Sequence, residues 1–151
     1  MGYWRMQLHP DDAARSSFHA ATCVTKGIIG LDFRKDVGDL RGGHGEIQVG
    51  QKDYRLFEAE MQVGDLVLIQ THHYPFALVE IASDYAYVPN AREAYGVWFR
   101  HLRLVRNASL YSDYITNPKN WQQITMTDTL APLRSSDTVS YRLIEEWRGA
   151  R

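Results

Sequence analysis

The chain has 151 residues, of which 44% are hydrophobic, 12% aromatic and 23% charged. A chain of this length and composition forms one domain whose core is large enough to fold without disulfides or a metal. Seventeen basic and eighteen acidic residues give a formal net charge of −1, which excludes a polybasic mode of nucleic-acid binding but leaves local basic surfaces open.

The first predicted elements are a strand at 3–8 and a helix that follows it. Either Asp11 or Asp12 is a good N-cap for the helix, which runs to about Lys26. Gly27 then stops the helix. The side chains expected on its buried face recur at helical spacing and are Ala14, Phe18, Ala21 and Val24.

A short buried strand is predicted next, at 28–33. The chain then enters a glycine-rich segment of mixed charge at 34–50, which we expect to be a mobile loop. A short helix follows at 51–61, because three large apolar side chains recur there at helical spacing. These side chains are Tyr54, Phe57 and Met61.

The second half of the chain is richer in strands. The run at 66–71 is apolar on both faces, which is typical of a strand at the centre of a sheet. A tight connection at 72–75 leads into a strand at 76–81. Two further strands are predicted, at 85–88 and 97–105.

The C-terminal part is expected to be largely helical and irregular. Asp128 is placed to cap a short helix, and Ser136 or Asp137 to cap a longer one that ends near Trp147. Together the elements predict one α+β domain over 1–151. Its five or six strands are expected to form a curved, mostly antiparallel β-barrel with helices packed around it.

Signals of catalysis or metal binding are weak. His19 and Cys23 share one helix face, but two ligands do not make a closed metal site. The adjacent His72 and His73 lie in a turn, where neighbouring side chains point to opposite sides. Gly-Gly-His-Gly at 42–45 lacks the ending of a phosphate-binding loop, and no Asp/Glu-x-Lys sequence of the nuclease type occurs. We therefore expect no enzymatic activity, no metal and no cofactor.

The cellular location is predicted from the cysteine content and the N-terminus. Cys23 is the only cysteine, so no disulfide framework is expected. The N-terminus lacks the apolar region of a signal peptide, and no apolar run approaches the ~18 residues of a membrane span. These features favour a cytoplasmic protein.

Arginines and aromatic residues are the features that favour binding. Thirteen of the seventeen basic residues are arginine, which suits bidentate recognition of phosphate or base edges, although a GC-rich genome produces the same bias. The strand at 97–105 and the arginine after it carry cations and no acid, either to contact phosphate or to protect an edge strand. These cations are Arg100, His101, Arg103 and Arg106.

The order of several short motifs resembles one protein family. Gly30-Leu31-Asp32-Phe33 follows the first helix, and Met-Gln-Val-Gly-Asp-Leu-Val-Leu at 61–68 leads through a hairpin to Ala-Leu-Val-Glu-Ile at 77–81. The basic strand at 98–105 and Thr-Asp-Thr-Leu at 127–130 come later. This ordered set covers most of the chain. It resembles the EVE/YTH branch of the PUA-like superfamily and, more narrowly, the N-terminal specificity domains of modification-dependent bacterial restriction systems.

The resemblance implies a non-catalytic domain that flips one nucleotide of double-stranded DNA into a pocket and reads its modification there. Asp32 stands where the YTH pattern has a Trp. This argues against an apolar methyl-adenine cage and offers an acceptor for an exocyclic amine. Placed on the family pattern, the base pocket consists of Asp32, Phe33, Tyr85, Tyr87 and Trp98. Contacts with the DNA backbone, or a wedge into the duplex, fall to His73, Tyr74, Arg100, Arg103 and Arg106.

Other interpretations are left open. Asp32 suits a turn-forming or capping carboxylate, and Trp98 and Trp4 suit the core. The effector nuclease or NTPase of a restriction or antiviral defence system would lie in the same or another chain, so 1–151 would be the N-terminal part of a longer protein. The alternatives to DNA are an RNA-modification reader of the EVE/YTH type and a PUA-like domain that binds a small molecule or a protein.

Overall fold

A computed structural model of the chain describes residues 1–8, 13–33, 35–42 and 51–151. The N-cap expected at Asp11 or Asp12 lies outside the described residues. So does much of the expected loop at 34–50, of which only 35–42 is described, including the short 3-10 turn Leu40–Gly42.

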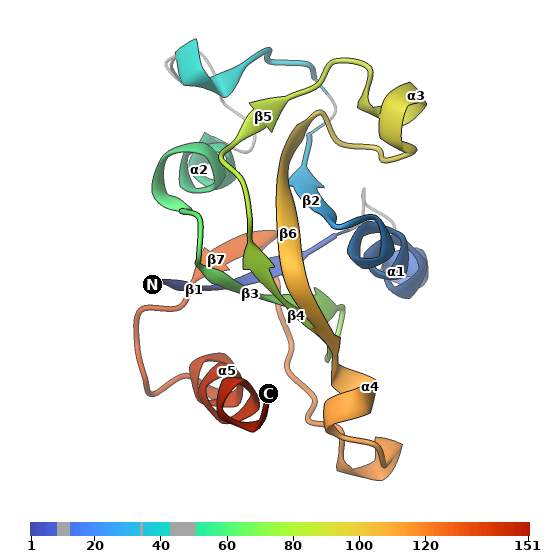
Figure 1. Cartoon of the computed structure of the whole chain (residues 1–151), viewed down its shortest axis with the longest axis vertical. Helices are drawn as coiled ribbons and strands as arrows, with labels where there is room; N and C mark the ends of the chain where they lie inside the picture. The colour runs from blue at the N-terminus through green and yellow to red at the C-terminus, as the bar shows by residue number, and fades with distance from the viewer. Residues whose placement is uncertain (9–12, 34, 43–50) are drawn as a thin grey trace.

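The fold is α+β and is built on a strongly curled, mixed sheet that forms a half-barrel (Figure 1). Within the described part of the chain, the strand order is β2-β6-β4-β3-β1-β7, and β5 pairs with β6 beyond this path. β1 and β3 are parallel, and the other pairs are antiparallel, so the expected curved and mostly antiparallel sheet is confirmed. The strands are β1 (Tyr3–Gln7), β2 (Ile28–Leu31), β3 (Leu66–Thr71), β4 (Tyr74–Ile81), β5 (Ala86–Tyr87), β6 (His101–Leu110) and β7 (Leu130–Pro132).

Helices cover the sheet on several sides. In Figure 1, α1 lies beside β2, α2 lies across the half-barrel from it, and α4 and α5 lie at the end away from β5. α2 passes directly into the π-helical turn η3 (Leu56–Glu60). The helices are α1 (Ser16–Lys26), α2 (Gln51–Arg55), α3 (Ala91–Tyr95), α4 (Tyr111–Tyr114) and α5 (Val139–Ala150). None of the helices in the described ranges has the length and apolar character needed to cross a membrane.

The central position of β3 is explained by its apolar side chains on both faces. Val67 and Ile69 belong to the core inside the half-barrel. Leu66 and Leu68 belong to a second core on the other face, where they pack with Trp147 of α5. Because side chains alternate along a strand, both faces of β3 are buried, which confirms the prediction made from its sequence.

α1 buries a different face from the one expected. It ends as predicted at Gly27, whose φ of 71° is left-handed and whose N–H donates to carbonyls of the last turn. However, its buried residues are Ser16, Ala20 and Cys23, while Phe18 is 56% exposed. Small side chains at this spacing let the helix backbone approach the sheet closely. The helix therefore turns these small residues toward the core and leaves the bulkier Phe18 on the outside.

β6 begins four residues later than predicted and runs five residues further. Trp98, Phe99 and Arg100 precede it, because the backbone N–H of Arg100 donates to the Asp32 carboxylate instead of to a strand. Phe99 fills the space above Gly30, where a Cβ would lie 2.0 Å from its ring. The β2–β6 pairing therefore requires a glycine at this position.

Two predictions for the C-terminal part need correction. Asp128 caps no helix, because the chain after it becomes β7 and Leu130 pairs with Met6 of β1. The long helix is α5, and its N-cap is Thr138, one residue after Asp137 and two after Ser136. The Thr138 hydroxyl accepts a hydrogen bond from the N–H of Tyr141 at 3.2 Å.

Candidate functional site

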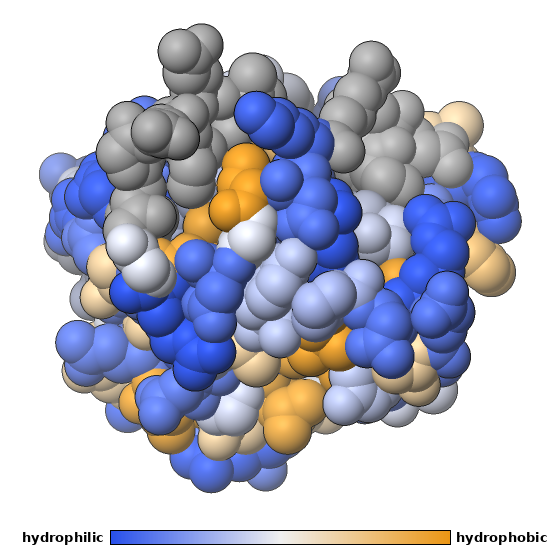
Figure 2. Space-filling model, turned by 90° about the horizontal axis from the view of Figure 1, so that it is seen from above, coloured by the Kyte–Doolittle hydropathy of each residue, from blue (hydrophilic) through white to orange (hydrophobic). Residues whose placement is uncertain are grey.

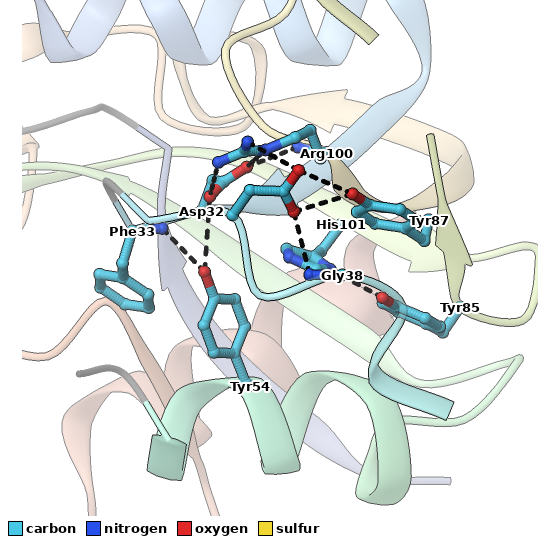
Figure 3. Close-up of polar contacts among 9 residues, drawn as sticks. Asp32, Phe33, Gly38, Tyr54, Tyr85, Tyr87, Arg100 and His101 are labelled. Atoms are coloured by element: carbon cyan, nitrogen blue, oxygen red, sulfur yellow. Dashed lines mark hydrogen bonds and ion pairs between the residues drawn. The ribbon is translucent and has the colours of Figure 1, made fainter. Parts of the chain in front are cut away.

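The residues of greatest chemical interest gather at one end of the half-barrel, where β2 ends and β6 begins. The antiparallel register pairs Leu31 with His101, and Tyr87 of β5 also pairs with His101. Residues that follow β2 and precede β6 therefore lie side by side with β5 (Figure 3). We call the resulting group the barrel-end cluster: Asp32, Phe33, Asp36, Tyr54, Tyr85, Tyr87, Arg100 and His101.

Asp32 and Arg100 form the strongest contact of the barrel-end cluster. The Arg100 side chain donates to Oδ2 of Asp32 at 2.7 Å and to Oδ1 at 2.9 Å, and its backbone N–H donates to Oδ2 at 3.0 Å. The Tyr54 hydroxyl donates to Oδ1 at 3.4 Å. The hydrogen bond with Asp32 raises the pKa of Arg100 above its ordinary value. A carboxylate has about four acceptor positions, and these four hydrogen bonds occupy them. Asp32 therefore positions its neighbours and has no acceptor position left for an exocyclic amine.

Asp36 ties the segment 35–42 to the same end of the sheet. The Tyr87 hydroxyl donates to Asp36 at 2.8 Å, and Arg100 forms an ion pair with Asp36 at 3.2 Å. The N–H of Gly38, in a left-handed conformation, also donates to the carboxylate. The Gly38 hydrogen bond, followed by that of Tyr87, holds the pKa of Asp36 below its ordinary value.

His101 is fully buried within the barrel-end cluster, with no exposed surface. Its Nδ1 lies 2.7 Å from the hydroxyl of Tyr85, which itself accepts a hydrogen bond from the N–H of Leu40. Burial lowers the pKa of His101 and raises that of Tyr85. Burial also raises the pKa of Tyr54 to about 12. These three side chains are therefore neutral at physiological pH.

Aromatic rings surround His101. The ring centroid of Tyr54 lies 4.8 Å from that of His101, and the ring centroid of Tyr87 lies 5.3 Å from it. Phe33 stands edge-on to Tyr54 at 5.2 Å. Phe33 and Tyr87 are only half-buried, so they border the surface. Seen from this end, the molecule exposes hydrophobic residues between hydrophilic ones (Figure 2).

The location of Arg103 contradicts its expected role as a phosphate contact. Arg103 is 2% exposed, because β6 directs its side chain into the half-barrel. Its guanidinium donates to the carbonyl oxygens of Phe57, Glu58, Met61 and Ser83. Three of these carbonyls belong to η3 or directly follow it. Arg103 therefore supplies hydrogen-bond donors to the free carbonyl groups at the end of a helical turn, and it does not face a ligand.

His73 and Tyr74 lie far from the barrel-end cluster. They are at the β3–β4 turn, next to the end of β4 that pairs with Leu110, whereas His101 begins β6. The 10 residues of β6 place these ends about 30 Å apart along the strand. Tyr74 instead lies beside Trp121, and the carbonyl of His73 accepts from the N–H of Ile124. A wedge formed by this turn would act at another place on the molecule.

Two other expected site residues also lie outside the barrel-end cluster. The ring neighbours of Trp98 are Phe99 and His19 of α1, so Trp98 faces the helix. Arg106 is exposed and forms an ion pair with Glu80 at 2.5 Å. The structure thus brings together Asp32, Phe33, Tyr85, Tyr87 and Arg100 of the expected set.

Tyr54, Asp36 and His101 complete the barrel-end cluster; the first two were not among the expected site residues, and His101 was expected only as one of the cations of the basic strand. The alternation along the basic strand does place His101 on the same face as Arg103, and that face turns inward. Tyr54 was predicted on a buried helix face, which is where it lies. Asp36 lies in a segment that has no periodic pattern, so nothing in the sequence indicated its contacts.

The described residues contain no group of three or more His, Cys, Asp or Glu side chains arranged to hold a metal ion. The barrel-end cluster itself has two carboxylates, but an arginine occupies the space between them. Its polar groups are therefore arranged for hydrogen bonding rather than for metal coordination.

The chain matches no protein-family model and no curated protein sequence at a significant level.

Proposed function

We propose that the protein is a non-catalytic, PUA-like nucleic-acid-binding domain of the EVE/YTH type, which holds one flipped base at the barrel-end cluster. The observation that carries this proposal is the set of aromatic rings around His101, namely Tyr54, Tyr85 and Tyr87, with Phe33 packed against Tyr54; Phe33 and Tyr87 border the surface. A base has a flat face for stacking and an edge for hydrogen bonds, so such a site suits it. Stacking contributes about 1–3 kcal/mol per base, which offsets the few kcal/mol needed to flip it.

Few phosphate contacts accompany this mode of binding. Arg103 is buried, and Arg100 is held by Asp32 and Asp36, although a quarter of its side chain is exposed. The segment 35–42 also contributes exposed cations, Lys35 and Arg41. With two or three phosphates neutralised, the logarithm of the affinity falls with the logarithm of salt concentration with a slope of roughly −2 to −3.

We further propose that the base is a modified base in double-stranded DNA, and that the domain supplies specificity to a restriction or defence system. A nuclease or NTPase in the same or another chain would act after recognition. The support is the ordered set of motifs in the sequence together with a curled sheet whose end carries Asp32, Phe33, Tyr85 and Tyr87.

The test is equilibrium binding to matched duplexes that differ in one central base, carried out at low salt. The duplexes carry cytosine, 5-methylcytosine, 5-hydroxymethylcytosine, 5-hydroxymethyluracil or N6-methyladenine, and a matched RNA duplex serves as a competitor. We expect one modified duplex to bind more tightly than its unmodified counterpart and than the RNA. Stronger binding to the RNA would support the RNA-reader alternative, and no binding to any of these nucleic acids would overturn the proposal.

The charges around the barrel-end cluster favour a second candidate, a free nucleoside or another small planar molecule. Asp32, Asp36 and Asp39 balance Arg100 and Arg41, so the site is not basic as a whole. A small neutral ligand would bind without a steep salt dependence. Binding of free nucleosides that is insensitive to salt, with no gain from an attached strand, would favour this candidate.

A further inference from the structure

Most hydrogen-bonding groups of the barrel-end cluster already have partners. Asp32 and Asp36 accept from Arg100 and from tyrosine hydroxyls, and the Tyr54 hydroxyl also accepts from the N–H of Phe33. Within the described part of the chain, Nε2 of His101 has no hydrogen-bond partner although it is fully buried. A buried polar atom without a partner destabilises the folded state, so its retention at an aromatic site calls for an explanation.

The hydrogen bonds on the other side of the ring define which nitrogen of His101 carries the proton. The hydroxyl of Tyr85 accepts from the N–H of Leu40, which leaves its own proton free to donate to Nδ1 of His101. Among the described residues this proton has no other acceptor, so Nδ1 is assigned as the acceptor and the proton of the neutral imidazole as lying on Nε2. The unpartnered atom is a donor.

On the basis of the base-binding function proposed above, we infer that Nε2 of His101 donates a hydrogen bond to a carbonyl oxygen of the bound base. The site then selects a keto base, such as guanine, thymine, uracil or a modified uracil, at this edge. The exocyclic amines of cytosine and adenine at the equivalent position would place a donor against a donor. His101 is thus a specificity-determining residue, and Asp32 is a positioning residue.

A base would reach Nε2 past Tyr87, the half-buried ring that lies directly beside His101 with 5.3 Å between ring centroids. His101 has no exposed surface, so a base reaches it only when a neighbouring side chain turns aside. Phe33 and Tyr87 border the surface, whereas Tyr54 and Tyr85 are buried. Side-chain rotations of this kind are common on binding and leave the backbone in place.

The test uses short single strands of abasic sites with one central base, so that flipping costs nothing. Thymine is compared with 5-methyl-2-pyrimidinone, and guanine with 2-aminopurine, because the second member of each pair lacks the keto group in question and, with it, the proton of the neighbouring ring nitrogen. We expect the wild type to prefer the keto base of each pair by roughly tenfold. In His101→Phe this preference should fall several-fold, and the difference between the wild type and the variant isolates the contact with the keto group from the effect of the ring proton.

Tyr85→Phe separates hydrogen bonding from packing. It keeps the ring and its packing but removes the donor to Nδ1, so the proton of His101 is free to move and the keto preference should fall while His101 remains. Imidazole ¹⁵N resonances of the wild type report the tautomer directly, even if a variant fails to fold. A proton on Nδ1, or equal binding of both members of each pair by the wild type, would overturn the inference and leave the proposed function standing. If the wild type binds no strand and no duplex, the proposed function itself fails.

Discussion

Asp32 holds Arg100 by three hydrogen bonds, two to the guanidinium at 2.7 and 2.9 Å and one to the backbone N–H at 3.0 Å. This relationship joins the end of β2 to the residue before β6. It also fixes the side chain of Arg100 toward Asp36 and thereby ties the segment 35–42 to the sheet. The carboxylate that the sequence suggested as a base contact is therefore the anchor of the barrel-end cluster.

Replacing Asp32 tests this anchoring role. Asp32→Asn keeps the size of the side chain but removes its charge, and we expect the free energy of unfolding to fall by about 1–3 kcal/mol. Urea unfolding followed by circular dichroism measures the change. The matched control is Glu80→Gln, which breaks the more exposed pair with Arg106 and should cost at most about 1 kcal/mol. Equal effects of the two substitutions would contradict the anchoring role.

Arg103 is predicted to support the fold. Arg103→Met retains much of the volume but leaves the carbonyls of Phe57 and Met61 without their buried donor. We expect the free energy of unfolding to fall by about 2–4 kcal/mol. Arg106→Met, on the exposed face of the same strand, should change stability by less than about 1 kcal/mol. A stable Arg103→Met variant with weakened nucleic-acid binding would restore the phosphate-contact interpretation.

The contact between Gly30 and Phe99 predicts a strong steric coupling. Gly30→Ala places a Cβ about 2.0 Å from the phenyl ring, so it should destabilise the protein by several kcal/mol. Phe99→Ala also destabilises, because the ring is fully buried. In the double variant the clash with the ring is absent, and only the clash with the backbone carbonyl of His101, 2.4 Å from the new Cβ, remains, so the combined loss should be smaller than the sum of the two. Additive losses in this double-mutant cycle would contradict the coupling to Phe99 and assign the whole cost to the His101 carbonyl.

His101 makes stability depend on pH. Burial lowers its pKa in the folded state below the ordinary value of 6.5, so the unfolded chain binds a proton first as the pH falls. The folded state should lose stability below about pH 6.5, with a slope of up to about 1.4 kcal/mol per pH unit for one proton, and gain nothing above it. His101→Phe should lack this slope between pH 6.5 and 5. The lowered pKa of Asp36 changes the stability only near and below pH 4, so its contribution can be measured separately from that of His101.

Much of the fold could be predicted from the sequence where local pattern and packing agree. The apolar run of β3 predicted a central strand, and Gly27 predicted the end of α1. The prediction failed for the buried face of α1, because close packing against the sheet favours Ser16, Ala20 and Cys23 over Phe18. No periodic pattern records how closely two elements approach.

The site was only partly predictable for a similar reason. Asp32, Phe33, Tyr85 and Tyr87 were expected together, and the β2–β6 and β5–β6 registers do bring them together. Arg103 was expected on the surface because charged residues usually lie there. In the structure, hydrogen bonds to four backbone carbonyls take the place of the hydrogen bonds that its guanidinium would make with water. Which cation is exposed and which is buried depends on a contact between β6 and η3, and these two segments are distant in the sequence.

The central claim is that a base binds at the barrel-end cluster, and the affinity of one matched pair of variants tests it most directly. Phe33→Ala removes a ring that borders the site, and Phe18→Ala removes an exposed ring on α1. With the best-bound modified duplex at low salt, Phe33→Ala should raise the dissociation constant by roughly tenfold or more, while Phe18→Ala should leave it within about twofold. Equal affinities of the two variants, or a larger loss for Phe18→Ala, would contradict the account.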